Sequence, residues 1–284
     1  MPPKSKLGQN FLRDEQAIRR IVAALGDCSG RTLVEIGPGR GAITHQLLAR
    51  AEKVIALEVD ETLAAELANE LAEADSAGAK VVVETGDVLA FDFKAASLSA
   101  AQPLIVVGNL PYYITSPILM KLAENAAVLD RAVLMVQREV ADRVTAMPGS
   151  RDFGLLSVAV QLHGAVEPLF TLPPGAFSPP PQVHSTVFRW RFAPRFEELG
   201  VDRGSFLLFL RRVFALKRKT LANNLRAAGM ESHTIAAALA NSGIDAKARA
   251  EALPIETLAG LWRTLQEEGA IPPGEMAPSK ESEL

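Results

Sequence analysis

The chain has a single cysteine, Cys28, in 284 residues, which excludes an internal disulfide and any metal site built from several thiolates. No uninterrupted apolar run approaches the roughly 18 residues of a membrane-spanning helix. The first residues also lack the apolar segment of a secretory signal peptide. These absences lead us to expect no membrane association and a cytoplasmic protein.

The chain also has no excess of positive charge, because it contains 30 Lys and Arg and 33 Asp and Glu, for a net charge of −3. Domains that bind nucleic acid over their whole surface are usually strongly basic, so any such affinity must come from local patches. The histidines are dispersed without the spacing of metal ligands, and neither a Ser-His-Asp nor an HExxH pattern occurs. The sequence therefore indicates no metal and no hydrolytic triad.

What the chain does contain is apolar material, 48% of its residues, enough for two domains of ordinary size. Residues 1–196 alternate short β-branched runs with helical stretches, as in an α/β fold with a mostly parallel sheet. The expected strands are 32–37, 53–60, 80–84, 104–108, 132–136, 155–162 and 186–191. The last two have no crossover helix between them, so they predict an antiparallel hairpin at the edge of a seven-stranded Rossmann-like sheet.

The remainder of the chain changes character. Residues 197–268 carry leucine, alanine and phenylalanine at helical spacing, which predicts a small all-helical domain. Residues 269–284 are rich in proline, glycine and charge, and we expect them to be disordered. Within 205–229 every charged residue is positive, which suggests an RNA-contacting face or a solvated helical surface: Arg211, Arg212, Lys217, Arg218, Lys219 and Arg226.

A glycine-rich loop, residues 37–41, joins the first strand to a helix and suits close approach of a nucleotide-like cofactor. Gly37 and Gly39 also fit the looser pattern of dinucleotide-binding loops, so the loop alone leaves the cofactor open. Glu58 ends the second strand and can accept hydrogen bonds from ribose hydroxyls, whereas Asp87 follows the third and can accept from an adenine amino group. Their convergence on one crevice favours a cofactor that contains adenosine.

The sequence Asn109-Leu110-Pro111-Tyr112 directly follows the fourth strand and resembles the N/D-P-P-Y/F/W type of motif found in amino-group methyltransferases. An aromatic amine attacks a methyl group only when its nitrogen becomes more tetrahedral. The Asn109 side-chain carbonyl and the backbone carbonyl of Leu110 or Pro111 can accept its two N–H bonds and enforce that geometry. Tyr112 can then stack on an extruded base, although a core position suits it too.

Phe177 begins the segment Phe177-Ser-Pro-Pro-Pro-Gln-Val183 in the expected hairpin loop. It could form the opposite wall of the base pocket, whereas a merely rigid proline loop is the competing interpretation.

Taken in order, GQNFL at 8–12, EIGPGRG at 35–41, LEVD at 57–60, NLPYYITSPI at 109–118 and FSPPPQVHS at 177–185 resemble the ribosomal RNA adenine dimethyltransferases of the KsgA/RsmA type. The resemblance spans residues 4 to about 266. It implies S-adenosylmethionine as cofactor and dimethylation of N6 on two adjacent adenosines near the 3′ end of 16S rRNA, within the immature small ribosomal subunit. It also implies that the seven-stranded sheet is arranged as in methyltransferases and that the cellular role is rRNA processing.

The same resemblance implies roles for individual residues. The family's cofactor contacts correspond to Asn10, Leu12, Gly37, Glu58, Asp87 and Asn109. The catalytic set corresponds to Asn109, Leu110, Pro111, Tyr112 and Phe177, with Tyr112 and Phe177 at the base-stacking positions.

Three other functions remain open at this stage. A related dimethyltransferase could act on 23S rRNA and confer antibiotic resistance. The glycine loop also suits a nicotinamide-dependent oxidoreductase, and the basic segment suits a noncatalytic assembly factor. No interface pattern is visible, so we expect a monomer.

Overall fold

The computed structural model describes residues 9–74 and 80–271, and it divides them into two compact units. The first unit comprises residues up to 141 together with 165–193. The second comprises 142–164 and the chain from 194 onward. Residues 142–164 thus join the helical unit, which differs from the single boundary at residue 196 expected from the sequence. Most of the tail, residues 272–284, for which the sequence predicts disorder, lies outside the described residues.

The first unit is built on a seven-stranded sheet in the order β4-β3-β2-β5-β6-β9-β7. Strands β4, β3, β2, β5 and β6 pair in parallel, and β9 pairs with β6 antiparallel. The strands are β2 (Thr32–Ile36), β3 (Lys53–Glu58), β4 (Val81–Thr85), β5 (Leu104–Asn109), β6 (Leu129–Gln137), β7 (Gly164–Leu172) and β9 (Ser185–Phe192). The predicted seven-stranded, mostly parallel fold is confirmed.

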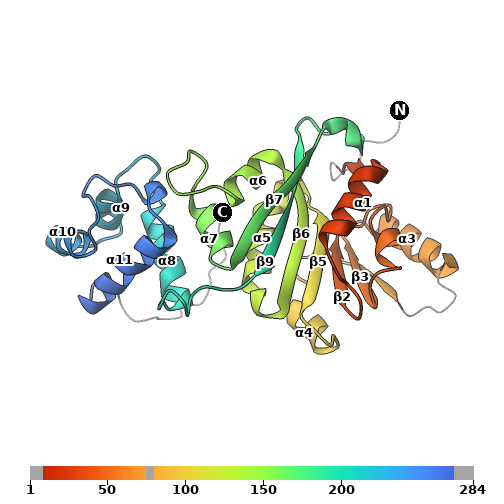
Figure 1. Cartoon of the computed structure of the whole chain (residues 1–284), viewed down its shortest axis with the longest axis horizontal. Coiled ribbons are helices and arrows are strands. Elements are labelled where there is room, and N and C mark those ends of the chain that lie inside the picture. Colours follow the sequence, from red (N-terminus) through yellow and green to blue (C-terminus); the bar gives the residue numbers. More distant parts are fainter. Residues whose placement is uncertain (1–8, 75–79, 272–284) are drawn as a thin grey trace. The chain divides into compact units, whose positions relative to one another are not determined.

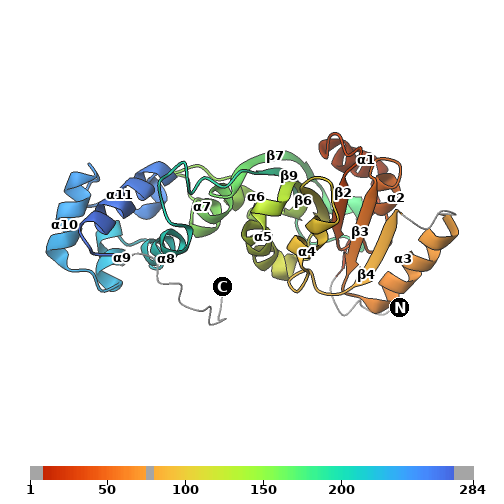
Figure 2. The same ribbon diagram turned by 90° about the horizontal axis from the view of Figure 1, so that it is seen from below.

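Helices lie on both faces of this sheet. In both views β6, near the middle of the sheet, lies between α1 and α5 (Figures 1 and 2). The apolar side of α1, with Ile21 and Val22, packs with Leu33 of β2 and Ile105 of β5 in one core cluster. The helical elements of this part are α1 (Glu15–Ala24), α2 (Thr44–Leu47), α3 (Glu61–Ala74), α4 (Phe93–Leu98), η1 (Tyr112–Ile114), α5 (Thr115–Glu124), η2 (Ala126–Val128), α6 (Arg138–Val144) and η3 (Pro174–Ala176).

The predicted strand 155–162 is wrong, because these residues form helix α7 (Leu155–Gln161). Ser157 accepts a hydrogen bond from the Gly154 backbone N–H at 3.0 Å and so caps the first turn. Val158 and Leu162 then pack in the core of the second unit, and this burial outweighs the β preference of the valines. The strand that neighbours β9 is instead β7, in which Pro168 is tolerated because β7 lies at the sheet edge.

The second unit is helical, as predicted for residues 197–268. Its core contains Phe206, whose ring stacks with that of Phe209 and meets that of Trp262 edge-on. Beyond α7 its helices are α8 (Arg203–Val213), α9 (Leu221–Ala227), α10 (Ser232–Asn241), η4 (Ala250–Ala252) and α11 (Ile255–Glu267).

Two short strands outside the main sheet were not expected from the sequence. Strand β1 (Phe11–Leu12) pairs antiparallel with β8 (Phe177–Ser178), with Leu12 opposite Phe177. This pairing joins the start of the described chain to the segment that precedes β9.

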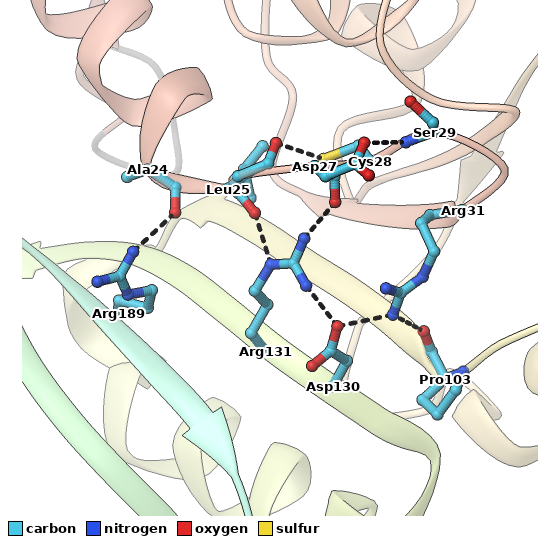
Figure 3. A network of polar contacts seen from close by, with 11 residues as sticks. Ala24, Leu25, Asp27, Cys28, Ser29, Arg31, Pro103, Asp130, Arg131 and Arg189 are labelled. Carbon is cyan, nitrogen blue, oxygen red and sulfur yellow. Dashed lines mark hydrogen bonds and ion pairs between the residues drawn. The ribbon is translucent and has the colours of Figure 1, made fainter.

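An arginine network fastens the amino-terminal ends of the parallel strands (Figure 3). Arg131 of β6 donates to the carbonyl oxygens of Leu25 and Asp27, both at 2.5 Å, and to the Asp130 carboxylate. Arg31 donates to the same Asp130 carboxylate at 2.7 Å. The loop between α1 and β2 is therefore tied to β6 at the end of the sheet opposite the candidate site.

Candidate functional site

A cavity of about 580 Å³ opens at the carboxyl ends of β2, β3 and β5. The chain runs outward from β2 to β4 and then returns to place β5 on the other side of β2, so the connections that leave β2 and β5 run in opposite directions at this edge. Such a switch point is where open α/β sheets bind ligands. The cavity is lined by nine of the predicted site residues: Asn10, Leu12, Gly37, Glu58, Asp87, Asn109, Leu110, Pro111 and Tyr112.

The glycine loop forms one wall of this cavity. Gly37 and Gly39 have φ angles of +67° and +56°, which side chains rarely adopt. A Cβ atom at Gly39 would also lie 3.0 Å from the Phe11 ring, so the loop and β1 are in close contact. The residue types that predicted the loop are therefore needed both for its turn and for its packing.

Glu58 organises the same loop from the end of β3. Its side chain is only 3% exposed. One carboxylate oxygen accepts from the Gly39 N–H at 3.0 Å, and the other accepts from the Asp60 N–H at 3.1 Å. Each oxygen offers a further lone pair, so the carboxylate can also accept the two hydroxyls of a ribose.

Asp87 lies on the cavity wall after β4. Its Oδ1 accepts from the Leu89 N–H at 2.9 Å, which closes a local turn. This turn holds the carboxylate at the cavity beside Gly86 and Val88.

Glu35, within β2, is a cavity residue that sequence reasoning did not single out. It is 1% exposed, and its Oε2 has no hydrogen-bond partner among the described residues. Burial, with a contribution from the nearby charge of Glu58, raises the pKa of Glu35 to about 7. The available signal was an acidic residue inside an otherwise apolar strand. A buried carboxyl with one oxygen left without a partner fits a ligand that brings a cationic group, as the amino-acid part of S-adenosylmethionine does.

Asn109 ends β5 at the opposite side of the cavity. Its Nδ2 donates to the Asn10 carbonyl oxygen at 3.0 Å, which fixes the amide and leaves Oδ1 as the acceptor on its other side. The preceding Gly108 allows β2 and β5 to approach, because a Cβ there would lie 2.7 Å from the Ile36 carbonyl oxygen.

The two candidate backbone acceptors of the motif differ. The Pro111 carbonyl oxygen already accepts from Thr115 Oγ1 at 2.9 Å and from the Ile114 N–H at 3.3 Å. Leu110 is held by its own N–H, which donates to the Met135 carbonyl oxygen at 3.0 Å. Because the lone pairs of Pro111 are engaged, the structure favours Leu110 over Pro111 as the second acceptor.

The two predicted stacking residues lie in different surroundings. Tyr112 is half-buried at the cavity, and its hydroxyl is 2.9 Å from Ser185 Oγ. Phe177 is 4% exposed and packs in the core with Leu12 and Leu172, and it is not among the residues that line the cavity. The structure therefore does not bring Phe177 to the cavity wall, because burial of its ring in the core is favourable.

The basic segment of the second unit lies on α8, α9 and the loop between them. Lys217, Arg218 and Lys219 are all exposed on this loop. Asn224 holds the loop from α9, since its Oδ1 accepts from the Leu216 N–H at 2.8 Å and its Nδ2 donates to the Leu216 carbonyl at 3.3 Å. Three consecutive cations are thus presented on an ordered backbone.

Two further observations concern residues 9–74 and 80–271 alone. In these ranges no group of three His, Cys, Asp or Glu side chains could hold a metal ion. No helix there is both long and apolar enough to cross a membrane.

Comparisons with known proteins agree with this geometry. A family model described as "Ribosomal RNA adenine dimethylase" matches residues 3–267. A protein from Acidobacterium capsulatum, named "Ribosomal RNA small subunit methyltransferase A", is 57% identical over 93% of this chain and 92% of its own length.

Two solved structures share the fold. A dimethyladenosine transferase from Plasmodium falciparum superimposes with a TM-score of 0.74 at 22% identity, over 91% of this chain and 98% of its own. The 23S rRNA methyltransferase ErmE gives a TM-score of 0.68 at 25% identity, over 90% of this chain and 100% of its own.

Proposed function

The chain belongs to the ribosomal RNA adenine dimethylase family, and we propose that it dimethylates N6 of two adjacent adenosines in the 3′-terminal hairpin loop of 16S rRNA. As a member of this family it is an S-adenosylmethionine-dependent rRNA methyltransferase. The small-subunit substrate is supported by the name of the Acidobacterium relative, at 57% identity, against 25% for ErmE. We further propose that it acts on the immature subunit, as a monomer in the cytoplasm.

The cavity residues divide the binding of the cofactor among them. Glu35 would pair with its amino group, Glu58 would accept its ribose hydroxyls, and Asp87 would accept from the adenine amino group. When bound, S-adenosylmethionine supplies an electrophilic methyl group on a sulfonium ion. The glycine loop brings backbone close to it, and β1 covers the loop through Phe11.

The residues at the end of β5 prepare the adenine amino group. Asn109 Oδ1 and the Leu110 carbonyl oxygen accept its two N–H bonds, so its lone pair is directed away from both acceptors and toward the methyl group. Tyr112 stacks on the extruded base, with its ring held by Ser185. No general base is needed, because the methylated ammonium loses its proton readily to water.

The observation that carries this proposal is the fixed amide of Asn109, whose Nδ2 is committed to Asn10 and whose Oδ1 is left to accept. The test is methyl transfer from radiolabelled S-adenosylmethionine to undermethylated small subunits, with large subunits in parallel and modified nucleosides identified by mass. We expect N6,N6-dimethyladenosine in 16S rRNA, lost in Asn109→Ala.

Each other outcome of that assay has a distinct meaning. Label in 23S rRNA alone would favour the alternative function, a 23S rRNA adenine dimethyltransferase that confers antibiotic resistance. Absence of label from both subunits, with an Asn109→Ala protein that still supports subunit maturation, would indicate a noncatalytic assembly factor.

The loop of Lys217, Arg218 and Lys219 supports a role of the second unit in holding RNA phosphates. We expect Lys217→Glu with Arg218→Glu to weaken affinity for the small subunit and to reduce its salt dependence, while cofactor affinity stays unchanged. The matched control is Lys247→Glu with Arg249→Glu, which makes the same charge change at two exposed positions of the same unit. Equal RNA affinity and salt slope in the two double variants would rule out this role.

A further inference from the structure

The only two tyrosines of the chain are adjacent, and both line the cavity. Tyr112 is half-buried, whereas Tyr113 is 63% exposed. Among the large apolar side chains that the structure describes as exposed, Val59 and Tyr113 are the two that line the cavity. Val59 follows Glu58 at the cofactor end, so Tyr113 is the exposed apolar group at the end with Asn109.

Both tyrosines lie on a backbone that is held in place. They form η1 together with Ile114, whose N–H donates to the Pro111 carbonyl oxygen at 3.3 Å, and Thr115 Oγ1 donates to the same oxygen at 2.9 Å. The hydroxyl of Tyr112 is fixed by Ser185. A 3₁₀-helix has three residues per turn, so consecutive side chains project about 120° apart. The two rings therefore cannot cover the same base.

We propose that Tyr113 is the stacking platform for the base of the nucleotide next to the target adenosine. This inference rests on the proposed function, and it identifies a residue that selects the sequence around the target. Unpaired RNA bases are commonly held by aromatic side chains, which accept any base face but stack best on purines. Because the backbone of η1 is already ordered, covering the ring costs little conformational entropy.

A platform of this kind lies on one side of the target along the RNA chain, so it serves the target whose neighbour on that side is the other adenosine. That neighbour offers a purine face to Tyr113. A pyrimidine neighbour would stack less well, so the wild-type enzyme should methylate its target less efficiently beside uridine than beside adenosine.

The test uses small subunits reconstituted with 16S rRNA in which both adjacent adenosines are kept, or the first or the second of them is replaced by uridine. Methylation of the remaining adenosine is measured by mass, and its kcat/KM is compared with that of the same adenosine in the native subunit. The enzymes are wild type, Tyr113→Ala, Tyr113→Phe and Leu98→Ala. Leu98→Ala is the control, because Leu98 is 88% exposed on α4 and is not part of the cavity.

We expect Tyr113→Ala to raise KM for the native subunit about ten-fold with kcat nearly unchanged, as removal of one base stack should. Its preference for adenosine over uridine should disappear, whereas Tyr113→Phe and Leu98→Ala should keep the wild-type preference. Tyr113→Ala with wild-type KM or with an intact preference would overturn the inference. Failure of the proposed function is distinguishable, since the wild-type enzyme would then leave the native small subunit unlabelled.

Discussion

Replacing Glu35 by Gln should make the protein's stability less dependent on pH. In the folded chain burial raises the pKa of Glu35 from 4.5 to about 7, with Glu58 adding repulsion. A carboxyl whose pKa is raised by folding binds a proton more tightly in the folded state. Its stabilising contribution is therefore complete below pH 4.5 and is lost as the pH rises to about 7. Gln has a similar size and never ionises, so the variant lacks this loss.

The size of this effect on the free energy of unfolding follows from the shift in the pKa of Glu35. A shift from 4.5 to about 7, at about 1.4 kcal/mol per pKa unit, corresponds to about 3 kcal/mol. Glu35 is 1% exposed, so solvent does not screen the effect. The free energy of unfolding of wild type, relative to that of Glu35→Gln, should thus fall by about 3 kcal/mol between pH 4.5 and pH 8, mostly below pH 7.

Urea unfolding of both proteins, without cofactor, at several pH values from 4.5 to 8 measures this difference, and taking the difference cancels the other titrating groups. Glu84→Gln is the matched control, because Glu84 is exposed on β4 and should show no such trend. A difference in free energy of unfolding between wild type and Glu35→Gln that stays constant over the whole pH range would refute the reasoning.

Three other substitutions test separate parts of the structure. Arg131→Met removes the donors to Leu25 and Asp27 and should lower the free energy of unfolding by about 3 kcal/mol; an unchanged urea midpoint would contradict it. Gly108→Val places a Cβ atom 2.7 Å from the Ile36 carbonyl oxygen of β2 and should lower the free energy of unfolding by about 2 kcal/mol or more. A variant as stable as the wild type would show that β2 and β5 can move apart. Thr115→Val removes the donor to the Pro111 carbonyl and should lower kcat about ten-fold, whereas Thr115→Ser should restore kcat. A Thr115→Val enzyme with the wild-type kcat would show that Thr115 has no positioning role.

Local sequence was sufficient for the sheet and for most of the cavity. Strands such as β5 and β6 contain continuous apolar runs, and such runs are typical of strands buried on both faces. The carboxyl ends of parallel strands meet at one edge, so residues after successive strands, Gly37, Glu58 and Asn109, could be placed at one site without coordinates.

Short apolar runs were less informative. Residues 155–162 contain valines and leucines that suit a strand. They form a helix because the helical conformation lets them pack in one core with distant residues such as Phe209. Strand β7 was missed because it contains Pro168 and is partly exposed, features that only an edge position allows.

Sequence by itself determined the class of fold, the glycine loop and the Asn-Leu-Pro-Tyr turn, because each depends on residue types within a few positions of one another. Only the tertiary structure decided that Phe177 packs in the core, that the Oε2 of Glu35 has no hydrogen-bond partner and that the Pro111 carbonyl is already engaged. Those outcomes depend on burial and on partners at other positions along the folded chain, as with Phe177 opposite Leu12, and no local pattern encodes them.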